Sequence, residues 1–338
     1  MPLSAEIDQP DSKFWSLSRF PNHSRATPVE VIDALTISRE DFVRRYVNHN
    51  RPCLIKNAVL HWPAFHKWKQ LDYIKDHSLN SAVVVVRSKV ISEVMAWSNP
   101  DVKAALVEYS NEVHSDIPFH DFLDSLGAGD HPLVADSCGF EEGEALELLR
   151  HDVAGLPFMP ELSTPLYYPP YRSFLYRNSY TDWHFHSADE TFMSQVVGAK
   201  EVLLLPPDEV TWQALRPVIE EVGYLYHIDT QRFPGTRNLC ALRTVVEPGD
   251  ALYIPVYWWH AVQSMDDAVG VTVAVTFRTP LHVIGDIRSP IARRMLRTHL
   301  RSLQAPLAIL AVLYSLAFRL GRRLVGIVMT QTRQGMRP

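Results

Sequence analysis

The distribution of apolar residues separates a mixed first part of the chain from a strand-rich second part. In the first part, the β-branched run 82–86 predicts a buried strand. Ser38 before the amphipathic segment 39–46 predicts an N-capped helix. The other elements expected here are a strand at 53–56, loop and helix within 62–77, a helix from 117, and loop with helix over 136–170. This mixture predicts an α/β N-terminal part.

Strands and tight turns dominate the second part. Residues 245–255 hold two apolar runs on either side of a Pro-Gly pair, which predicts a strand, a turn and a second strand. His260 then opens the next strand. We expect that strand to run beside the one that carries His184, within one barrel.

Three histidines and one glutamate have the spacing of a metal site. His184 and His186 lie two residues apart, so on a strand both side chains face the same way. A turn at 187–189 would return Glu190 to the same pocket, and His260 supplies the third imidazole. Such ligands suit Fe, Mn, Ni, Cu or Zn, and two His with one carboxylate are typical of non-haem Fe(II). The alternative is that one or two of these histidines are ordinary core or surface residues.

Several stretches resemble the JmjC/cupin-like family. They are 181–186, 198–208 and 247–260, with 51–58 and 62–68 similar to that family's N-terminal segment. The resemblance covers about 28–280. It implies a mainly β fold with flanking helices, in which a double-stranded β-helix (a jelly-roll or cupin barrel) has its core at about 172–280.

The resemblance also implies ligands. His184, His186 and His260 would hold Fe(II) or another divalent metal, and Thr181 and Lys200 would hold 2-oxoglutarate. Glu190 would be a fourth metal ligand, or it would accept a hydrogen bond from one of the metal ligands. No further catalytic residue is expected beyond this metal site.

One position departs from the family pattern, because His186 stands where the family has Asp. A carboxylate ligand would reduce the net charge of a divalent metal site from +2 to +1, whereas a neutral imidazole leaves it at +2. Lys200 distinguishes a protein that uses 2-oxoglutarate from one that does not, because a dianionic cosubstrate needs a buried cation at its far end. Lys200 shares a strand face with Val202 and Leu204, so it points into the barrel if they do. The alternative is a solvated lysine beside the turn at Gly198.

Three functional hypotheses follow. The leading one is a JmjC-type dioxygenase, an oxidoreductase that uses Fe(II) and 2-oxoglutarate to hydroxylate or demethylate a protein side chain. The second is a noncatalytic cupin-fold protein that binds a partner or a membrane. The third is a three-His metal cupin that works without 2-oxoglutarate and depends on Glu190.

Charge is distributed unevenly along the chain. Residues 288–338 contain ten Arg, no Lys and no acidic residue, which leaves 23 basic against 38 acidic residues in 1–287. The tail also contains apolar helical segments, with an uncharged run at 302–318 that is borderline short for a membrane span. We expect it to pack as helices in a homodimer interface, or alternatively to lie on a membrane surface. Nucleic acid is disfavoured because the Arg residues are not interleaved with stacking aromatics.

Composition bounds the remaining questions. Cys53, Cys138 and Cys240 are far apart and lack metal spacing, which favours reduced thiols in a reducing compartment. The N-terminus shows no signal-peptide pattern. We therefore expect a cytoplasmic or nuclear protein, or alternatively one that is membrane-associated through its tail. The expected organisation is an N-terminal extension (1–27), a JmjC/cupin-like domain (28–280) and a basic, partly apolar helical tail (281–338).

Overall fold

The structure is a computed structural model of the chain. It describes residues 16–86, 90–91, 113–129, 132–160, 165, 168–186, 189–221 and 230–279, with the single tail positions 293, 306, 309, 310, 313 and 317.

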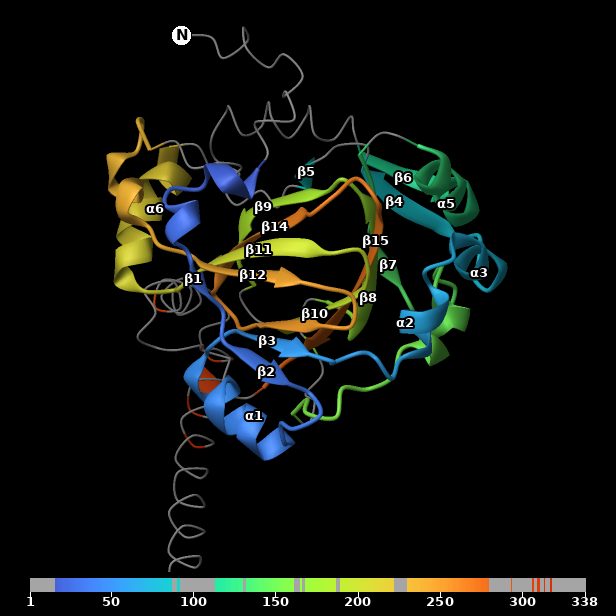
Figure 1. Ribbon diagram of the computed structural model, residues 1–338, viewed down its shortest axis with the longest axis horizontal. Helices are drawn as coiled ribbons and strands as arrows, with labels where there is room; N and C mark the ends of the chain where they lie inside the picture. The colour runs from blue at the N-terminus through green and yellow to red at the C-terminus, as the bar shows by residue number, and fades with distance from the viewer. Residues whose placement is uncertain are drawn as a thin grey trace, which may run out of the picture.

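Two mainly antiparallel sheets face each other at the centre of the molecule (Figure 1). The six-stranded sheet has the order β1-β12-β11-β14-β9-β5, and the nine-stranded sheet has the order β2-β3-β13-β10-β15-β8-β7-β4-β6. The pairs β1/β12, β2/β3 and β5/β9 are parallel, and all the other pairs are antiparallel. This mixed α/β arrangement is consistent with the cupin fold that the sequence indicates.

The strands of the six-stranded sheet are β1 (Thr27–Pro28), β5 (Val90–Ile91), β9 (Tyr180–His184), β11 (Lys200–Leu205), β12 (Leu242–Val246) and β14 (Trp259–Ser264). Those of the nine-stranded sheet are β2 (Val31–Asp33), β3 (Cys53–Lys56), β4 (Ala82–Val86), β6 (Val113–Pro118), β7 (Leu133–Gly139), β8 (Tyr171–Arg177), β10 (Glu190–Val197), β13 (Ala251–Ile254) and β15 (Val269–Phe277).

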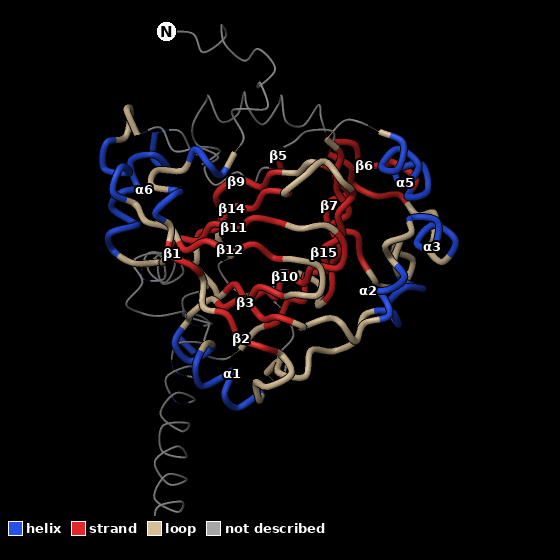
Figure 2. The backbone as a smooth tube through the Cα atoms, viewed as in Figure 1, coloured by secondary structure: helices blue, strands red, loops and turns tan. Residues whose placement is uncertain are grey.

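The helices lie outside the two sheets (Figure 2). The α-helices are α1 (Arg39–Arg45), α2 (Pro63–Lys67), α3 (Leu71–Asp76), α5 (Phe119–Ala128) and α6 (Glu209–Glu221). Short 3-10 helices are η1 (Leu17–Arg19), η2 (His23–Arg25), η3 (Val47–His49), η4 (Glu147–Asp152) and η5 (Pro234–Asn238).

Most of the local predictions are confirmed. Ser38 caps α1 by accepting a hydrogen bond from the backbone N–H of Asp41 at 3.1 Å. The strands expected at 53–56 and 82–86 are β3 and β4, and the strand–turn–strand at 245–255 is the β12–β13 connection. At the turn, Gly249 has φ +101°, a left-handed conformation that favours glycine.

Two predictions in the first part differ from the structure at their boundaries. The helix expected from 117 is α5, which begins at Phe119 because Ile117 and Pro118 still belong to β6 and pair with β4. The segment 136–170 contains loop and the short helix η4, as expected, but its first residues, 136–139, belong to β7, which joins β4 to β8. Its pairing partners are distant in sequence, so local pattern gave no sign of this strand.

An aromatic core joins the N-terminal helices to the nine-stranded sheet. Phe42 of α1 is fully buried, and its ring lies 5.5 Å from that of Phe192 on β10 and 5.2 Å from that of Tyr253 on β13. Phe277 of β15 stacks on Phe192 at 5.1 Å. Helix α1, which connects β2 to β3 of this sheet, therefore covers part of this face.

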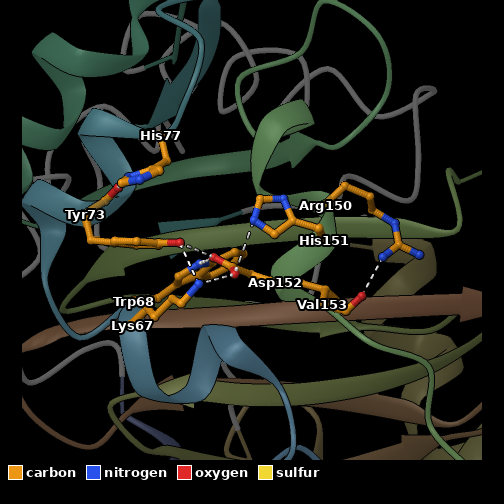
Figure 3. Close-up of polar contacts among 8 residues, drawn as sticks. All are labelled: Lys67, Trp68, Tyr73, His77, Arg150, His151, Asp152 and Val153. Carbon is orange, nitrogen blue, oxygen red and sulfur yellow. Dashed lines mark hydrogen bonds and ion pairs between the residues drawn. The ribbon is translucent and has the colours of Figure 1, made fainter.

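A buried carboxylate also holds the N-terminal helices in place (Figure 3). Asp152, at the end of η4, is fully buried and accepts hydrogen bonds from Lys67 Nζ (3.1 Å), Trp68 Nε1 (3.0 Å) and the Tyr73 hydroxyl (3.0 Å). His151 Nε2 lies 3.6 Å from the same carboxylate. The network thus connects η4 to the α2–α3 region through groups that would each be costly to bury alone.

The protonation of Asp152 couples this network to pH. Burial raises the pKa of the carboxyl, but the hydrogen bonds from Trp68, Lys67 and Tyr73 outweigh it, so the pKa lies below its ordinary value of 3.8. A lowered folded-state pKa stabilises the fold above the unfolded-state value, and this contribution is lost as the pH falls through the folded-state value.

We predict that Asp152→Asn lowers the free energy of unfolding by about 2 kcal/mol at pH 7, because three donors lose their charged acceptor. The measurement is denaturant unfolding at pH 7 and below pH 4, where the difference from the unmodified protein should shrink. Glu142→Gln, which changes an exposed carboxylate, is the control. Equal stability of the two variants at pH 7 would contradict the prediction.

The tail predictions fall largely outside the described residues. The tail positions that are described are helical and exposed, among them Ile309, Leu310 and Leu313. Within the described part of the chain, none of the helices combines the length and apolar character needed to cross a membrane. The predicted dimer or membrane role of 288–338 stays a prediction.

Candidate metal centre

The pairing of β9 with β14 brings the three histidines together. His184, the last residue of β9, lies directly opposite His260 on β14, as expected from the sequence. His186 follows two residues after the end of β9, and its backbone carbonyl accepts a hydrogen bond from the N–H of Tyr257 at 2.8 Å. The imidazole ring centroids are 4.1 Å (184–260), 4.9 Å (186–260) and 5.5 Å (184–186) apart.

Each histidine offers one ring nitrogen to a common point. The three ligand atoms lie within 4.8 Å of one another, and all three side chains are buried. Three imidazole nitrogens gathered at this spacing match the donor set of a divalent transition metal with further coordination positions open. The site thus fits a metal by its chemistry.

Hydrogen bonds fix two of the rings. His260 Nδ1 donates to the backbone carbonyl of Trp258 at 2.9 Å, which leaves Nε2 as the ligand nitrogen. His186 Nδ1 lies 3.1 Å from the hydroxyl of Thr191 on β10. Partners of this kind set ring orientation and tautomer in metal sites.

Burial keeps two of these imidazoles in their metal-binding form. The pKa of His186 lies well below 6.5 because of burial first, and then because of the neighbouring His260, His184 and Arg172. Burial followed by His184 likewise lowers the pKa of His260. His186 and His260 are therefore neutral at neutral pH, and protons do not compete with a metal for them.

Glu190 lies away from this cluster. It is fully buried at the start of β10, where its carboxylate accepts hydrogen bonds from the hydroxyl of Tyr253 and from the hydroxyl (2.8 Å) and N–H (3.2 Å) of Thr279. On the same strand, Thr191 and Met193 line the cavity beside the histidines. Because side chains alternate along a strand, Glu190 occupies the opposite face. Among the described residues, the metal-binding group consists of the three histidines alone.

A cavity of about 280 Å³ extends from the three histidines between the two sheets. Thr181 and Lys200 line it together with the histidines, so the predicted cosubstrate residues share one space with the predicted metal ligands. Lys200 is 7% exposed, and its Nζ lies 3.9 Å from the ring centroid of Tyr176. The side chain therefore points into the interior, as the alternation with Val202 and Leu204 suggested.

Lys200 carries its amine into a site where burial disfavours the charged form. Burial lowers the pKa of its amine to about 7. In the described part of the structure no carboxylate forms an ion pair with it. An anion that binds in the cavity would stabilise the protonated form of this amine, because it would provide the opposite charge that the buried amine lacks.

Two functional candidates were missed by the sequence reading. Arg172 of β8 is 7% exposed and lines the cavity, with its guanidinium carbon 3.8 Å from the ring centroid of Tyr168. Thr191 contacts a metal ligand. Alternation along 172–176 could have shown that Arg172 shares a face with Phe174 and Tyr176. Nothing in the sequence around 172–176 indicates that this face of the strand points toward the histidines.

Comparison with known proteins agrees with this geometry. Residues 39–280 match the family described as the cupin-like domain, so the chain belongs to that family. The match spans the paired strands that carry the histidines and the strand that carries Lys200.

The relatives of the chain are JmjC-type proteins with different stated activities. A lysine-specific demethylase of Arabidopsis thaliana is 27% identical over 70% of this chain and 52% of its own length. A bifunctional peptidase and (3S)-lysyl hydroxylase of Homo sapiens is 26% identical over 68% of this chain and 78% of its own. The tRNA wybutosine-synthesizing protein 5 of Danio rerio is 24% identical over 70% and 72%. The chain thus spans about half the length of the plant relative, and the relatives do not share one substrate.

We predict that His260→Ala abolishes stoichiometric binding of a divalent metal, because it removes one of three ligands. Metal content after loading with Fe(II) under anaerobic conditions, and separately with Zn(II), measures the effect. His49→Ala, which changes an exposed histidine, should bind metal as the unmodified protein does. Retention of one tightly bound metal in folded His260→Ala protein would contradict the prediction.

Proposed function

We propose that this protein is an Fe(II)- and 2-oxoglutarate-dependent oxygenase of the JmjC type that hydroxylates or demethylates a protein side chain. One observation carries the proposal: three imidazoles gathered at metal-ligand spacing and the buried Lys200 line the same cavity. A metal site alone would support many chemistries. The lysine adds a recognition point for a cosubstrate that is anionic at its far end.

The chain's own residues would divide the work of binding. His184, His186 and His260 would hold the metal and leave adjacent coordination positions open. Lys200 and Thr181 would bind the distal carboxylate of 2-oxoglutarate, and the cavity walls would keep water from the reacting centre. Fe(II) with 2-oxoglutarate would, when bound, activate O2, which is the oxidant: one oxygen atom is taken up as 2-oxoglutarate is converted to succinate and CO2, and the other is inserted into a C–H bond.

The separation between Lys200 and the three histidines suits a short dicarboxylate. Lys200 pairs with Ser264 on β14, and Leu204 pairs with His260, so four residues separate the lysine from a metal ligand along these strands. At about 3.3 Å per residue this is roughly 13 Å between backbone positions. Both side chains reach into the cavity and shorten the gap, so one small molecule would contact both.

The protein substrate of the proposal rests on family relationship. Of the relatives described above, one is a lysine-specific demethylase and one is a bifunctional peptidase and lysyl hydroxylase, so the names of both specify lysine. The tests below distinguish this proposal from a metal cupin that works without 2-oxoglutarate. The three-His cupin hypothesis gains no support from Glu190, because that carboxylate faces away from the histidines.

The direct test is consumption of 2-oxoglutarate. We expect anaerobically purified, Fe(II)-loaded protein to convert 2-oxoglutarate to succinate when O2 is admitted, slowly without a substrate and faster with one. The His260→Ala variant is the inactive control, and His49→Ala should behave as the unmodified protein does. Tight metal binding without 2-oxoglutarate affinity or turnover would overturn the proposal in favour of a cupin of another reaction class. Absence of both would favour a noncatalytic role.

Lys200→Met should weaken 2-oxoglutarate binding at least tenfold, because a buried charge-assisted hydrogen bond contributes about 1.5–3 kcal/mol. Isothermal titration calorimetry on Zn(II)-loaded protein measures this without turnover. Lys69→Met, which removes an exposed amine outside the cavity, is the matched control. Equal affinity in the Lys200 and Lys69 variants would contradict the assigned role of Lys200.

The same experiment has a pH dependence. The pKa of Lys200 is about 7 before the anion binds, and the bound carboxylate favours the protonated amine. Binding above pH 7 should therefore take up close to one proton, and the affinity should fall between pH 7 and pH 8.5. Titrations in two buffers with different ionisation enthalpies measure the uptake. The uptake should be absent in Lys200→Met.

A further inference from the structure

His186 is the metal ligand that strand pairing does not place. The last ladder pair between β9 and β14 joins His184 to His260, and His186 lies two residues beyond the end of β9. Its ring nitrogen Nδ1 lies 3.1 Å from the hydroxyl of Thr191, and its backbone carbonyl accepts a hydrogen bond from the N–H of Tyr257 at 2.8 Å. The second of these contacts holds the main chain of the ligand, so the position of His186 depends on that of Tyr257.

Tyr257 belongs to the 255–258 turn, which contacts two of the metal ligands. The turn connects β13 to β14. The N–H of Tyr257 reaches the carbonyl of His186, and the carbonyl of Trp258 accepts the hydrogen bond from Nδ1 of His260 at 2.9 Å. Two adjacent residues of one turn therefore hold the main chain of one ligand and the ring orientation of another.

The turn has a backbone conformation that a tyrosine does not adopt readily. Tyr257 has φ +65°, in the left-handed region that favours glycine, although it carries a large and buried ring. The hydrogen bond that closes the turn, from the N–H of Trp258 to the carbonyl of Pro255, is long at 3.5 Å. Because a strained conformation persists only where its surroundings hold it, the turn depends on contacts from outside.

Asn50 makes contacts of this kind on both sides of Tyr257. Its side-chain amide donates to the carbonyl of Val256 at 3.2 Å, and its backbone carbonyl accepts a hydrogen bond from the indole N–H of Trp258 at 2.7 Å. These bonds join Asn50 to the residues directly before and after Tyr257. They therefore oppose rotation of Tyr257 out of its left-handed conformation.

The N-terminal part of the fold fixes the position of Asn50. Asn50 ends η3, where its own φ is +51° and its N–H donates to the carbonyl of Val47. Three residues later, Cys53 begins β3 and pairs with Tyr253 of β13, directly before the turn. The register of β3 with β13 thus brings Asn50 to the turn, although 206 positions separate the two residues that its amide joins.

We propose that Asn50 is a positioning residue for the metal centre, which acts through the 255–258 turn on His186 and His260. The inference goes beyond the proposed function, because it rests on the metal site of that proposal and needs no 2-oxoglutarate. Without the Asn50 amide, the turn would relax, displace the main chain of His186 and reorient the ring of His260. The N-terminal part of the chain would thus contribute to metal affinity, although none of its described residues belongs to the histidine cluster.

Two matched asparagine variants test this role. Asn50→Gly introduces a residue that adopts the left-handed conformation freely, and it removes only the side-chain amide. Asn57→Gly is the control, because Asn57 has φ +62° and its amide donates to Asp33 at 3.1 Å, outside the metal site. Titration of the metal-free, full-length proteins with Zn(II) against a competing chelator measures the dissociation constant of each.

The expected effect follows from the distance of Asn50 from the metal. Removal of a group that orients a metal ligand typically weakens metal binding about 10–100-fold, and Asn50 acts one contact further out. We therefore expect roughly tenfold weaker Zn(II) binding in Asn50→Gly and a change of less than about threefold in Asn57→Gly. Each variant loses one side-chain hydrogen bond, so an effect on folding alone would lower both affinities alike.

The absorption spectrum of bound Co(II) reports ligand geometry independently of affinity. At saturating Co(II), the ligand-field bands of Asn50→Gly should differ in position or intensity from those of the unmodified protein, whereas those of Asn57→Gly should not. Trp258→Phe, which removes the indole N–H and keeps an aromatic ring, should change the bands as Asn50→Gly does. It provides the same test from the other side of Tyr257 if Asn50→Gly does not fold.

The double variant Asn50→Gly/Trp258→Phe shows whether the two residues act through one turn. It should bind Zn(II) about as tightly as the weaker single variant, because substitutions that break the same connection are not additive. Losses of affinity that multiply in the double variant would overturn the proposal. Equal Zn(II) affinity and identical Co(II) bands in the Asn50 and Asn57 variants would also overturn it.

Failure of this inference is distinguishable from failure of the proposed function. If His260→Ala loses the metal while Asn50→Gly binds it as the unmodified protein does, the metal centre stands and the positioning role falls. If Asn50→Gly weakens metal binding but the unmodified protein binds no 2-oxoglutarate, the positioning role stands and the oxygenase proposal falls. If the unmodified protein binds no metal, both fall.

Discussion

The antiparallel pairing of β14 with β9 is the constraint on which the site depends. It places His260 directly opposite His184 although 76 positions separate them in the chain. The same strand β14 pairs on its other side with β11, which fixes Lys200 four residue positions from His260. One strand therefore sets both the position of His260 opposite His184 and the separation of Lys200 from His260. Backbone hydrogen bonds of the ladder make that distance a property of the fold.

The lining of this cavity combines three imidazoles with two buried basic residues, Lys200 and Arg172. His186 stands where the JmjC pattern has a carboxylate, so the three histidines would bring no negative charge to a bound metal. Burial disfavours the charged form of Lys200, and an anion in the cavity would favour it.

The covering of the nine-stranded sheet explains the position of Glu190. On the cavity side of β10, Thr191 and Met193 face the metal site, while Glu190 and Phe192 face the N-terminal segments. There the carboxylate of Glu190 accepts hydrogen bonds from the hydroxyls of Tyr253 and Thr279, so its oxygens have partners within the protein. The Asp152 network fastens part of the same N-terminal covering. The first part of the chain therefore closes the sheet that forms one wall of the cavity.

The sequence alone determined the local elements and the main residue types of the site. The spacing of His184 and His186, the turn before His260 and the alternation around Lys200 are short-range patterns, and strand geometry converts them directly into shared faces. Tertiary structure alone decided the rest. It paired β7 into the sheet, turned Glu190 away from the three histidines and placed Arg172 in the same cavity as them, because these outcomes depend on which distant strands become neighbours. A residue's face follows from its own strand, but what that face meets follows from the pairing of the whole sheet.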